Sequence, residues 1–204
     1  MENLKEMSIH STTSLTASEN GEHTYAFTKD FEELNGKRGV LILLYPTRTE
    51  ENYHVEDSTT IHIMKHMKQL GLKSYTIVNL FSHVVRKRLS TRGLTIDEKN
   101  LQFIKTEIFE KYDSEKDIVI IAWGNSHETS QAVNDAKKKV LEMWSELYPS
   151  ETFYVLIGKV SSKDLRIVGK RICHYYGTGQ LCKTYGNSTQ LFHCIKTVQA
   201  NAKR

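Results

Sequence analysis

The sequence predicts an α/β protein built on a parallel sheet with helices on both faces. Short runs rich in Val, Ile and Leu alternate with longer runs whose apolar residues recur at helical spacing. A strand that is apolar throughout has both faces buried, as in a parallel sheet covered by helices. Five runs are expected to be strands: 24–27, 40–44, 75–79, 118–122 and 153–157.

The amphipathic segments between the strands are expected to be helices. Polar residues that can cap them are Asp57 or Ser58, Asp97 and Ser126. Gly71 can end the first helix in the left-handed conformation that glycine tolerates. The third helix would bury a stripe of Ala132, Ala136, Val140, Met143 and Leu147, and a last helix is expected near 191–198. We interpret these stripes as core faces.

Length and composition indicate one globular domain. The chain has 204 residues, of which 39% are hydrophobic and 25% charged. Residues 1–22 are polar and are expected to form a loose arm or a short edge structure before a single domain at 23–204. No apolar run approaches the roughly 20 residues that span a bilayer, and no secretory signal is present, so a cytoplasmic protein without membrane contact is expected. A net charge of +4 permits weak attraction to polyanions.

The cysteines and histidines indicate neither a disulfide framework nor a metal centre. The three cysteines have no CxxC spacing and are expected to be reduced. A zinc site is an alternative, although the spacing fits no compact chelate; its ligands would be Cys173, His174, Cys182, His193 and Cys194. His62 and His66 lie four residues apart on a predicted helix, but without the glutamate of HExxH they are expected to be ordinary surface residues. No metal or cofactor is expected.

The loops at the carboxyl ends of the strands are the expected place for a ligand. Right-handed crossovers bring these ends to one edge of the sheet, where open α/β proteins bind their ligands. The loops are Tyr45-Pro46-Thr47, Asn79-Leu80-Phe81, Trp123-Gly124-Asn125 and Gly158-Lys159. The amide of Asn79 carries both a donor and an acceptor and suits the edge of a base, although Asn is also a common turn former.

Common motifs for nucleotide binding and hydrolysis are missing. The chain has no GxxxxGK[ST] loop and no GxGxxG after a strand. The stretch 124–128 resembles a nucleophile elbow, but the second glycine of GxSxG is absent, and Ser126 is explained as a helix cap. The densest basic run is either a solvated loop or a set of phosphate contacts; it consists of Arg86, Lys87, Arg88 and the nearby Arg92.

Four short motifs follow one another at the predicted strand ends. They are LILLYPTRTE at 41–50, EDSTT at 56–60, IVNLF at 77–81 and IIAWG at 120–124. In this order they resemble the family known as domain of unknown function 1643. Its members show Asn-Pro-Ser after the first core strand, then Asp-x-Thr, Asn-Leu-Phe, Trp-Gly and a late histidine. The resemblance covers roughly residues 24–180.

That family is in turn similar to the uracil-DNA glycosylases. The resemblance implies a three-layer α/β/α sandwich with a central, mostly parallel four-stranded sheet. It also implies that Asn79 stands where those enzymes read uracil, and that Trp123 and Gly124 match their Leu-Trp-Gly. His174 is the nearest candidate for the histidine that stabilises negative charge on uracil.

Departures from the glycosylase pattern imply a loss of catalysis. Tyr45 replaces the Asp or Asn that positions the attacking water, and a neutral phenol cannot polarise water as a carboxylate does. Its ring would also occupy the space of a flipped base. The late motif around His174 lacks the proline and serine that contact DNA phosphates. The resemblance thus implies that Tyr45 fills an inherited base pocket.

The expected function is therefore that of a catalytically inactive glycosylase homologue of the kind carried on staphylococcal mobile genetic elements. Its partner would be an acidic protein that inhibits true glycosylases by mimicking DNA, or DNA itself, bound weakly. Complementary charge would come from Arg86, Lys87, Arg88, Arg92, Lys170 and Arg171.

Two alternatives remain at this stage. The first is an active enzyme on a nucleobase, nucleoside or nucleotide, with Asn79 for recognition and Asp57 or His174 for proton transfer. The simpler interpretation of Asp57, and the one we favour, is a helix cap. The second alternative is a structural or assembly role with a collapsed pocket.

Overall fold

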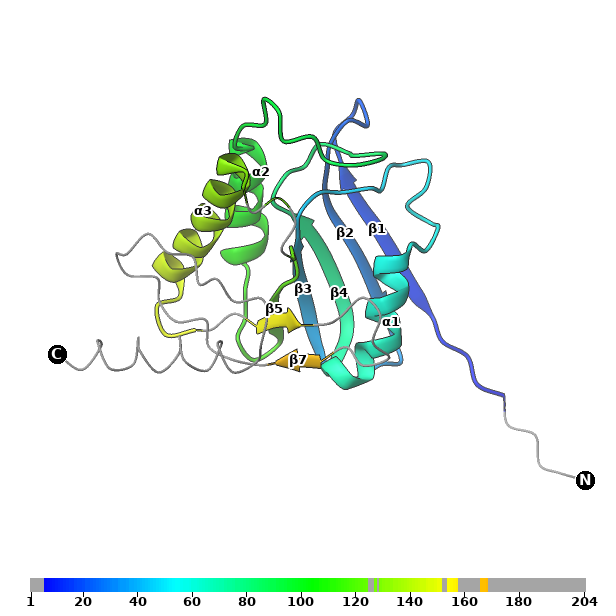
Figure 1. Cartoon of the computed structure of the whole chain (residues 1–204). Coiled ribbons are helices and arrows are strands. Elements are labelled where there is room, and N and C mark those ends of the chain that lie inside the picture. Colours follow the sequence, from blue (N-terminus) through cyan, green and yellow to red (C-terminus); the bar gives the residue numbers. More distant parts are fainter. Residues whose placement is uncertain (1–5, 125–126, 128, 152–153, 158–165, 169–204) are drawn as a thin grey trace, which may run out of the picture.

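A computed structural model describes residues 6–124, 127, 129–151, 154–157 and 166–168. The strands are β1 (Ser11–Ala17), β2 (Thr24–Phe31), β3 (Lys37–Leu43), β4 (Leu72–Asn79), β5 (Asp117–Ile121), β6 (Tyr154–Ile157) and β7 (Arg166–Val168). The helical elements are α1 (Ser58–Leu70), α2 (Glu98–Phe103), its π-helical continuation η1 (Ile104–Phe109) and α3 (Gln131–Leu147). Figure 1 shows the helices on both sides of one sheet, and the predicted α/β class is confirmed.

The sheet is mixed and has seven strands within the described residues, in the order β1-β2-β4-β3-β5-β6-β7. Its four central strands, β4, β3, β5 and β6, are parallel, whereas β1, β2 and β7 are antiparallel to their neighbours. The prediction of a four-stranded sheet was therefore wrong in the number of strands. Antiparallel strands extend the parallel centre on both sides.

The polar composition of β1 explains why it was not predicted as a core strand. Its sequence STTSLTA lies at the sheet edge, where only alternate residues are partly covered. Backbone hydrogen bonds to β2 hold it there, and these need no apolar side chain. The segment expected to be a loose arm or a short edge structure thus contributes an edge strand, and β2 runs on to Phe31 beyond its predicted end.

Two apolar cores lie on opposite faces of the sheet. On one face α2, η1 and α3 pack against the strands, with Ile104, Val140 and Ile42 in the same cluster. On the other face α1 packs through Ile63, against a cluster that contains Leu41. Consecutive residues 41 and 42 of β3 enter different cores because side chains alternate along a strand. Both faces of the central strands are therefore buried, as their continuous apolar sequences predicted.

The helix ends agree with the predictions for α1 and α2 but not for α3. Asp57 caps α1 in a capping box with Thr60, and Gly71 ends it at φ 65°. The side chain of Asp97 accepts a hydrogen bond from the backbone of Asn100 at the start of α2. Helix α3 begins only at Gln131, so the prediction that it starts from Ser126 was wrong.

Just before α3 the Ser130 amide donates to the His127 carbonyl at 2.9 Å, and Ser126 itself lies outside the described residues. The stripe predicted for α3 is buried at Ala136 and Val140, and Met143 and Leu147 pack, partly buried, against the same core. The residues of α3 that are buried are Val133, Ala136, Lys137, Val140 and Trp144. The helix predicted near 191–198 lies outside the described residues.

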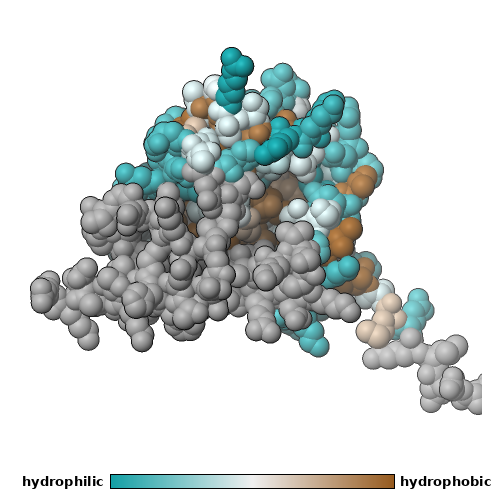
Figure 2. Space-filling view, in the orientation of Figure 1, coloured by the Kyte–Doolittle hydropathy of each residue, from teal (hydrophilic) through white to brown (hydrophobic). Residues whose placement is uncertain are grey.

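The visible described surface is largely hydrophilic, with hydrophobic residues at scattered positions (Figure 2). Among the described helices, none has the length and apolar content needed to cross a bilayer.

The hydroxyl of Tyr75 provides a stability prediction. Tyr75 on β4 is 0% exposed, and its hydroxyl has no hydrogen-bond partner among the described residues. Burial, followed by the negative charge of Glu56, raises its pKa, so the phenol stays neutral. Tyr75→Phe should raise the free energy of unfolding by about 1 kcal/mol, because it removes an unsatisfied buried polar group without changing the ring.

Tyr148→Phe is the matched control for Tyr75→Phe in urea denaturation. The Tyr148 hydroxyl donates to the carbonyl oxygen of Phe109 at 2.5 Å, so the same chemical change should here lower stability by about 1 kcal/mol. A loss of stability in Tyr75→Phe would contradict the prediction.

Candidate functional site

The carboxyl ends of β3, β4 and β5 meet at one edge of the sheet. The Leu80 amide donates to the Leu43 carbonyl at 2.9 Å, and the Ala122 amide donates to the Ile42 carbonyl at 2.9 Å. These bonds continue the parallel register just past the strand ends. As a result Tyr45, Asn79 and Trp123 lie on adjacent strand ends, as crossover topology requires.

Tyr45 and Pro46 leave β3 along the core rather than into solvent. Tyr45 is half-buried and packs against the larger apolar cluster, and Pro46 is buried. The Pro46 carbonyl accepts a hydrogen bond from the Val85 amide at 2.9 Å, which ties this loop to the loop after β4. Thr47 is exposed, and its hydroxyl lies 3.5 Å from a carboxylate oxygen of Asp57.

Asn79 and Asn100 form a buried pair of amides below this edge. They are 3% and 0% exposed, and the Asn100 side-chain nitrogen donates to the Asn79 backbone carbonyl at 2.6 Å. Within the described part of the chain, neither side-chain oxygen has a hydrogen-bond partner. Burying a hydrogen-bond acceptor without a donor destabilises a fold. The side-chain oxygens of Asn79 and Asn100 could therefore each accept a hydrogen bond from a ligand.

Trp123 and Gly124 lie just past the end of β5, at the same edge of the sheet. Trp123 is 7% exposed, and Gly124 adopts φ 66°, which a side chain would strain. Lys137 of α3 is 5% exposed; its ammonium lies 3.5 Å from the Gly124 carbonyl and 6.0 Å from the centre of the Trp123 ring. Lys137 was not predicted, because it interrupts an apolar stripe with a residue type that is normally exposed.

Asp57 is used structurally. One carboxylate oxygen accepts from the Thr60 amide at 2.8 Å and lies 3.5 Å from the Arg48 guanidinium. The other is the oxygen near Thr47. The geometry is that of a helix cap, the second of the two readings that the sequence allowed.

Arg48 organises the loop between β3 and α1, and the sequence did not single it out. Its side chain is buried, donates to the carbonyls of Tyr53 and Val55 at 3.0 and 2.6 Å, and stacks 4.1 Å from the centre of the Phe27 ring. A third bond goes to the Thr60 hydroxyl at 2.8 Å. The loop that carries Tyr45 and Pro46 is thereby fixed to α1 and β2.

Glu56 makes this loop sensitive to acid. Burial alone would raise its pKa, but hydrogen bonds from Lys29 and Thr60 and the charges of Lys29 and Arg48 outweigh burial and lower it. Stability from the carboxylate is therefore present above the unfolded pKa, about 4.3, and is lost as pH falls through the lower folded value. Glu56→Gln should lower the free energy of unfolding at pH 7, and the difference from wild type should shrink below pH about 4.

Urea titrations between pH 7 and pH about 3 would check this, with Glu110→Gln as the control. Glu110 is exposed and makes no ion pair in the part of the chain that the structure describes, so its substitution should leave the profile unchanged. A Glu56→Gln difference that is constant with pH would refute the assignment.

A second polar network was not predicted. The Ser82 hydroxyl donates to Asp97 at 2.6 Å, so its oxygen accepts from Nδ1–H of His23 at 2.8 Å. No pattern in the chain indicated this network, because His23 reaches the edge only through the antiparallel direction of β2.

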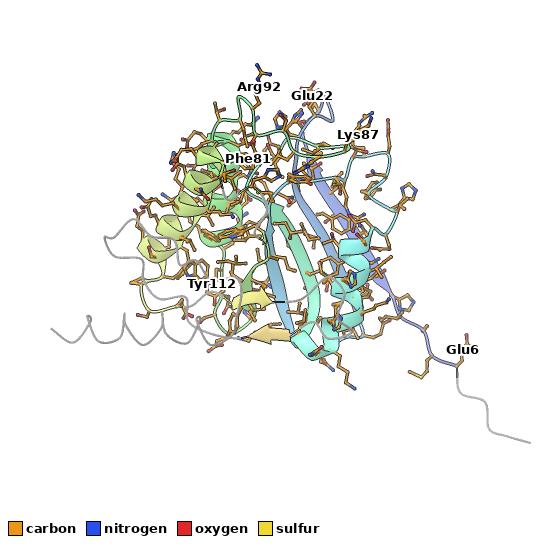
Figure 3. The ribbon with its side chains drawn as sticks, viewed as in Figure 1. Glu6, Glu22, Phe81, Lys87, Arg92 and Tyr112 are labelled. Atoms are coloured by element: carbon orange, nitrogen blue, oxygen red, sulfur yellow. The ribbon has the colours of Figure 1, made fainter. Side chains whose placement is uncertain are left out.

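The segment 82–97, which we call the cationic loop, follows Phe81 at the same edge. Arg86, Lys87, Arg88 and Arg92 are all exposed, and none of them forms an ion pair with another described residue. Figure 3 shows Arg92 and Lys87 at the outer ends of two lobes of this loop, while Phe81 lies inside.

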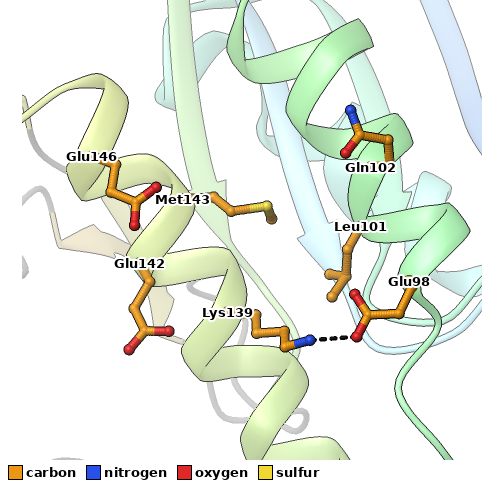
Figure 4. Close-up of a pocket in the computed structure, with 7 residues that line it drawn as sticks. All are labelled: Glu98, Leu101, Gln102, Lys139, Glu142, Met143 and Glu146. Atoms are coloured by element: carbon orange, nitrogen blue, oxygen red, sulfur yellow. Dashed lines mark hydrogen bonds and ion pairs between the residues drawn. The ribbon is translucent and has the colours of Figure 1, made fainter.

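The other predicted site residues lie outside the described residues: Lys170, Arg171, His174, the loop at 158–159 and the cysteines of the alternative zinc site. The described ranges contain no group of three side chains that could hold a metal ion. A small groove of about 180 Å³ lies between α2 and α3, and an ion pair between Glu98 and Lys139 crosses it (Figure 4).

Comparison with known families shows which family the chain belongs to. The family model described as "Protein of unknown function (DUF1643)" matches residues 25–163, which include the three described strand ends. The chain belongs to the DUF1643 family. The resemblance drawn from the strand-end motifs is thereby confirmed for this family, while nothing in the comparisons supports the further step to uracil-DNA glycosylases.

Other comparisons say little more about this DUF1643 chain. No curated protein matches it. Among solved structures it is similar to a hetero-hexameric glutamate dehydrogenase from Thermus thermophilus in a leucine-bound form, at 12% identity and a TM-score of 0.35. That match covers 70% of this chain and 32% of the dehydrogenase chain, so the chain spans about a third of that structure.

Proposed function

We propose that this chain is a catalytically inactive relative of uracil-DNA glycosylases that acts by binding an acidic macromolecule. The partner is either an acidic protein that mimics DNA or DNA itself. The observation that carries the proposal is the half-buried Tyr45, packed against the core just past the end of the central strand β3, next to the end of β4 that carries the buried Asn79. By resemblance this is the place of the water-positioning residue, and a phenol is too weak a base for that role.

The surroundings of Tyr45 support inactivity. The carboxylate of Asp57 caps α1, approaches Arg48 and faces Thr47, so it is not poised to activate water.

The distribution of charge supports an acidic partner. The cationic loop presents four basic residues without described ion pairs beside the strand ends. In the sequence, residues 169–204 contain six Lys and Arg and no Asp or Glu, whereas residues 1–168 contain 22 basic and 24 acidic residues. Such asymmetry is typical of chains that bind polyanions.

Binding titrations at low and moderate salt test the proposal. The pure protein should release no uracil from DNA, and it should bind either an acidic glycosylase-inhibitor protein or DNA with an affinity that falls steeply with salt. Arg86→Glu/Arg88→Glu should weaken binding, whereas Lys65→Glu/Lys68→Glu on α1 changes the same charge elsewhere and should not. Tyr45→Asp should leave binding intact, because it changes the residue just past the end of β3 and none of the cations of the cationic loop.

Each contrary result is informative. Efficient uracil excision by wild type would refute inactivity. Failure of both acidic ligands to bind at low salt would refute the binding role and favour a structural one. We expect the inhibitor protein to bind more tightly than DNA.

One observation favours a second candidate, an enzyme on a nucleobase, nucleoside or nucleotide. The unpartnered, buried side-chain oxygen of Asn79 could accept a hydrogen bond from the edge of a base. Turnover of such a compound that is lost in Asn79→Ala but kept in a folded Arg86→Glu/Arg88→Glu variant would favour this candidate.

A further inference from the structure

The cationic loop is closed at its base. The backbone amide and the hydroxyl of Ser82, at one end of the loop, both donate to the Asp97 carboxylate at the other, at 2.8 and 2.6 Å. The other oxygen of Asp97 accepts from the Asn100 amide at 3.1 Å. A compact surface loop with joined ends is an Ω-loop, a form that is often functional.

The first limb of the loop is fixed to the body of the protein. The Val84 amide donates to the Glu22 carbonyl and the Val85 amide to the Pro46 carbonyl, both at 2.9 Å. The segment from Arg86 to Gly93 therefore projects from a rigid base beside the strand ends. This explains why Lys87 and Arg92 mark the outer ends of its lobes in Figure 3.

The loop surrounds a hollow of about 640 Å³ with an apolar floor and a cationic rim. That volume is in the range of small-ligand sites, about 300–1,000 Å³. Phe81 and Leu89 are buried in the floor, and Leu94 is half-buried there. The rim carries Arg86, Lys87 and Arg88.

The acidic groups of the hollow are already engaged. Both oxygens of Asp97 accept hydrogen bonds at the base of the loop, and Glu98 pairs with Lys139 of α3. The rim cations have no such partners among the described residues. The hollow therefore favours a ligand that is anionic at one end and apolar at the other.

We propose that this hollow binds one nucleotide unit, with the base over the apolar floor and the phosphate at the guanidinium groups of the rim. A bare inorganic anion would not use the floor, and a neutral aromatic compound would not use the cations. The nucleotide is either a free nucleoside monophosphate or a unit of single-stranded DNA. The inference rests on the proposed function because it uses the same cationic loop. It goes further in assigning that loop a defined nucleotide site, whereas the proposed function requires only that the loop attract polyanions.

Isothermal titration of the full chain at low salt tests the site with four probes: thymidine monophosphate, thymidine, inorganic phosphate and a short oligo-dT. Thymidine monophosphate should bind more tightly than either of its halves. Arg86→Gln/Arg88→Gln should weaken its binding by about tenfold or more, because charge-assisted hydrogen bonds to phosphate are lost. Lys65→Gln/Lys68→Gln is the matched control and should stay within about twofold of wild type.

A floor variant tests the other half of the site. Leu94→Ala should weaken the binding of thymidine monophosphate, while the binding of inorganic phosphate should stay unchanged. Tighter binding of oligo-dT than of the monophosphate would identify single-stranded DNA as the source, and the reverse would identify the free nucleotide.

The outcomes separate this inference from the proposed function. If DNA or the acidic protein binds but thymidine monophosphate does not, the nucleotide site is refuted and the polyanion partner stands. If the monophosphate binds and neither macromolecule does, the site stands and the proposed partner is refuted. Equal binding of the monophosphate by wild type and Arg86→Gln/Arg88→Gln would place the site elsewhere and overturn the inference.

Discussion

Arg48→Ala should lower the free energy of unfolding by about 3 kcal/mol, the largest effect we expect from a single polar substitution. Arg48 is 6% exposed, and its guanidinium contacts two backbone carbonyls, the Thr60 hydroxyl and the carboxylates of Glu56 and Asp57. Truncation would leave these acceptors short of donors and open space beside Phe27. The free energy is measured by urea denaturation followed by circular dichroism.

Two further variants define the cause. Arg48→Lys keeps the charge but not the planar fork, so it should recover less than half of the loss. Arg92→Ala removes an exposed arginine and should stay within about 0.5 kcal/mol of wild type. A loss below about 1 kcal/mol in Arg48→Ala would show that the loop does not depend on this residue.

The effect of Arg48 should also reach the candidate site. Because Arg48 fixes the loop that begins with Tyr45 and Pro46, amide hydrogen exchange in residues 49–57 should accelerate in Arg48→Ala. The Val85 amide, bonded to Pro46, should lose protection as well.

Asp117→Ala should cost about 2 kcal/mol. Asp117 starts β5, is 6% exposed, and binds Arg38 of β3 through two bonds of 2.6 and 2.8 Å. The same carboxylate accepts from the Asp113 amide at 2.9 Å, so its loss leaves a backbone donor unpaired. The expected cost lies below that of a fully buried pair because Arg38 is half exposed.

A surface pair provides the comparison for Asp117. Lys138 and Glu142 are 3.6 Å apart on α3 with both side chains about half exposed, so Glu142→Ala should change stability by less than about 0.5 kcal/mol. Asp117 lies at the edge of the sheet opposite the strand-end loops, so Asp117→Ala should bind acidic ligands like wild type at a temperature where it is folded. Equal stability losses for the two variants would contradict the role given to Asp117.

The local features of this fold were readable because they depend on neighbours in the chain. Continuous apolar runs located the central strands, and Asp57 and Gly71 bounded α1 correctly, since capping uses atoms within a few residues. An edge structure was expected within residues 1–22 but was not located as strand β1, and the start of α3 was placed too early. Backbone pairing at a sheet edge leaves little trace in the side-chain pattern, and the start of α3 has no side-chain cap hydrogen bond.

The amino-acid pattern was sufficient to predict the α/β class, the family and the strand ends at which to look for a site. Which polar residues meet at those strand ends became clear only from the folded chain. Folding buried Arg48 in the loop of Tyr45, joined Ser82 to Asp97 and His23, and left the cations of loop 82–97 without described partners. The physical reason is that burial and pairing depend on residues distant in the chain, and the antiparallel β2 brings His23 to an edge that only parallel strands were expected to form.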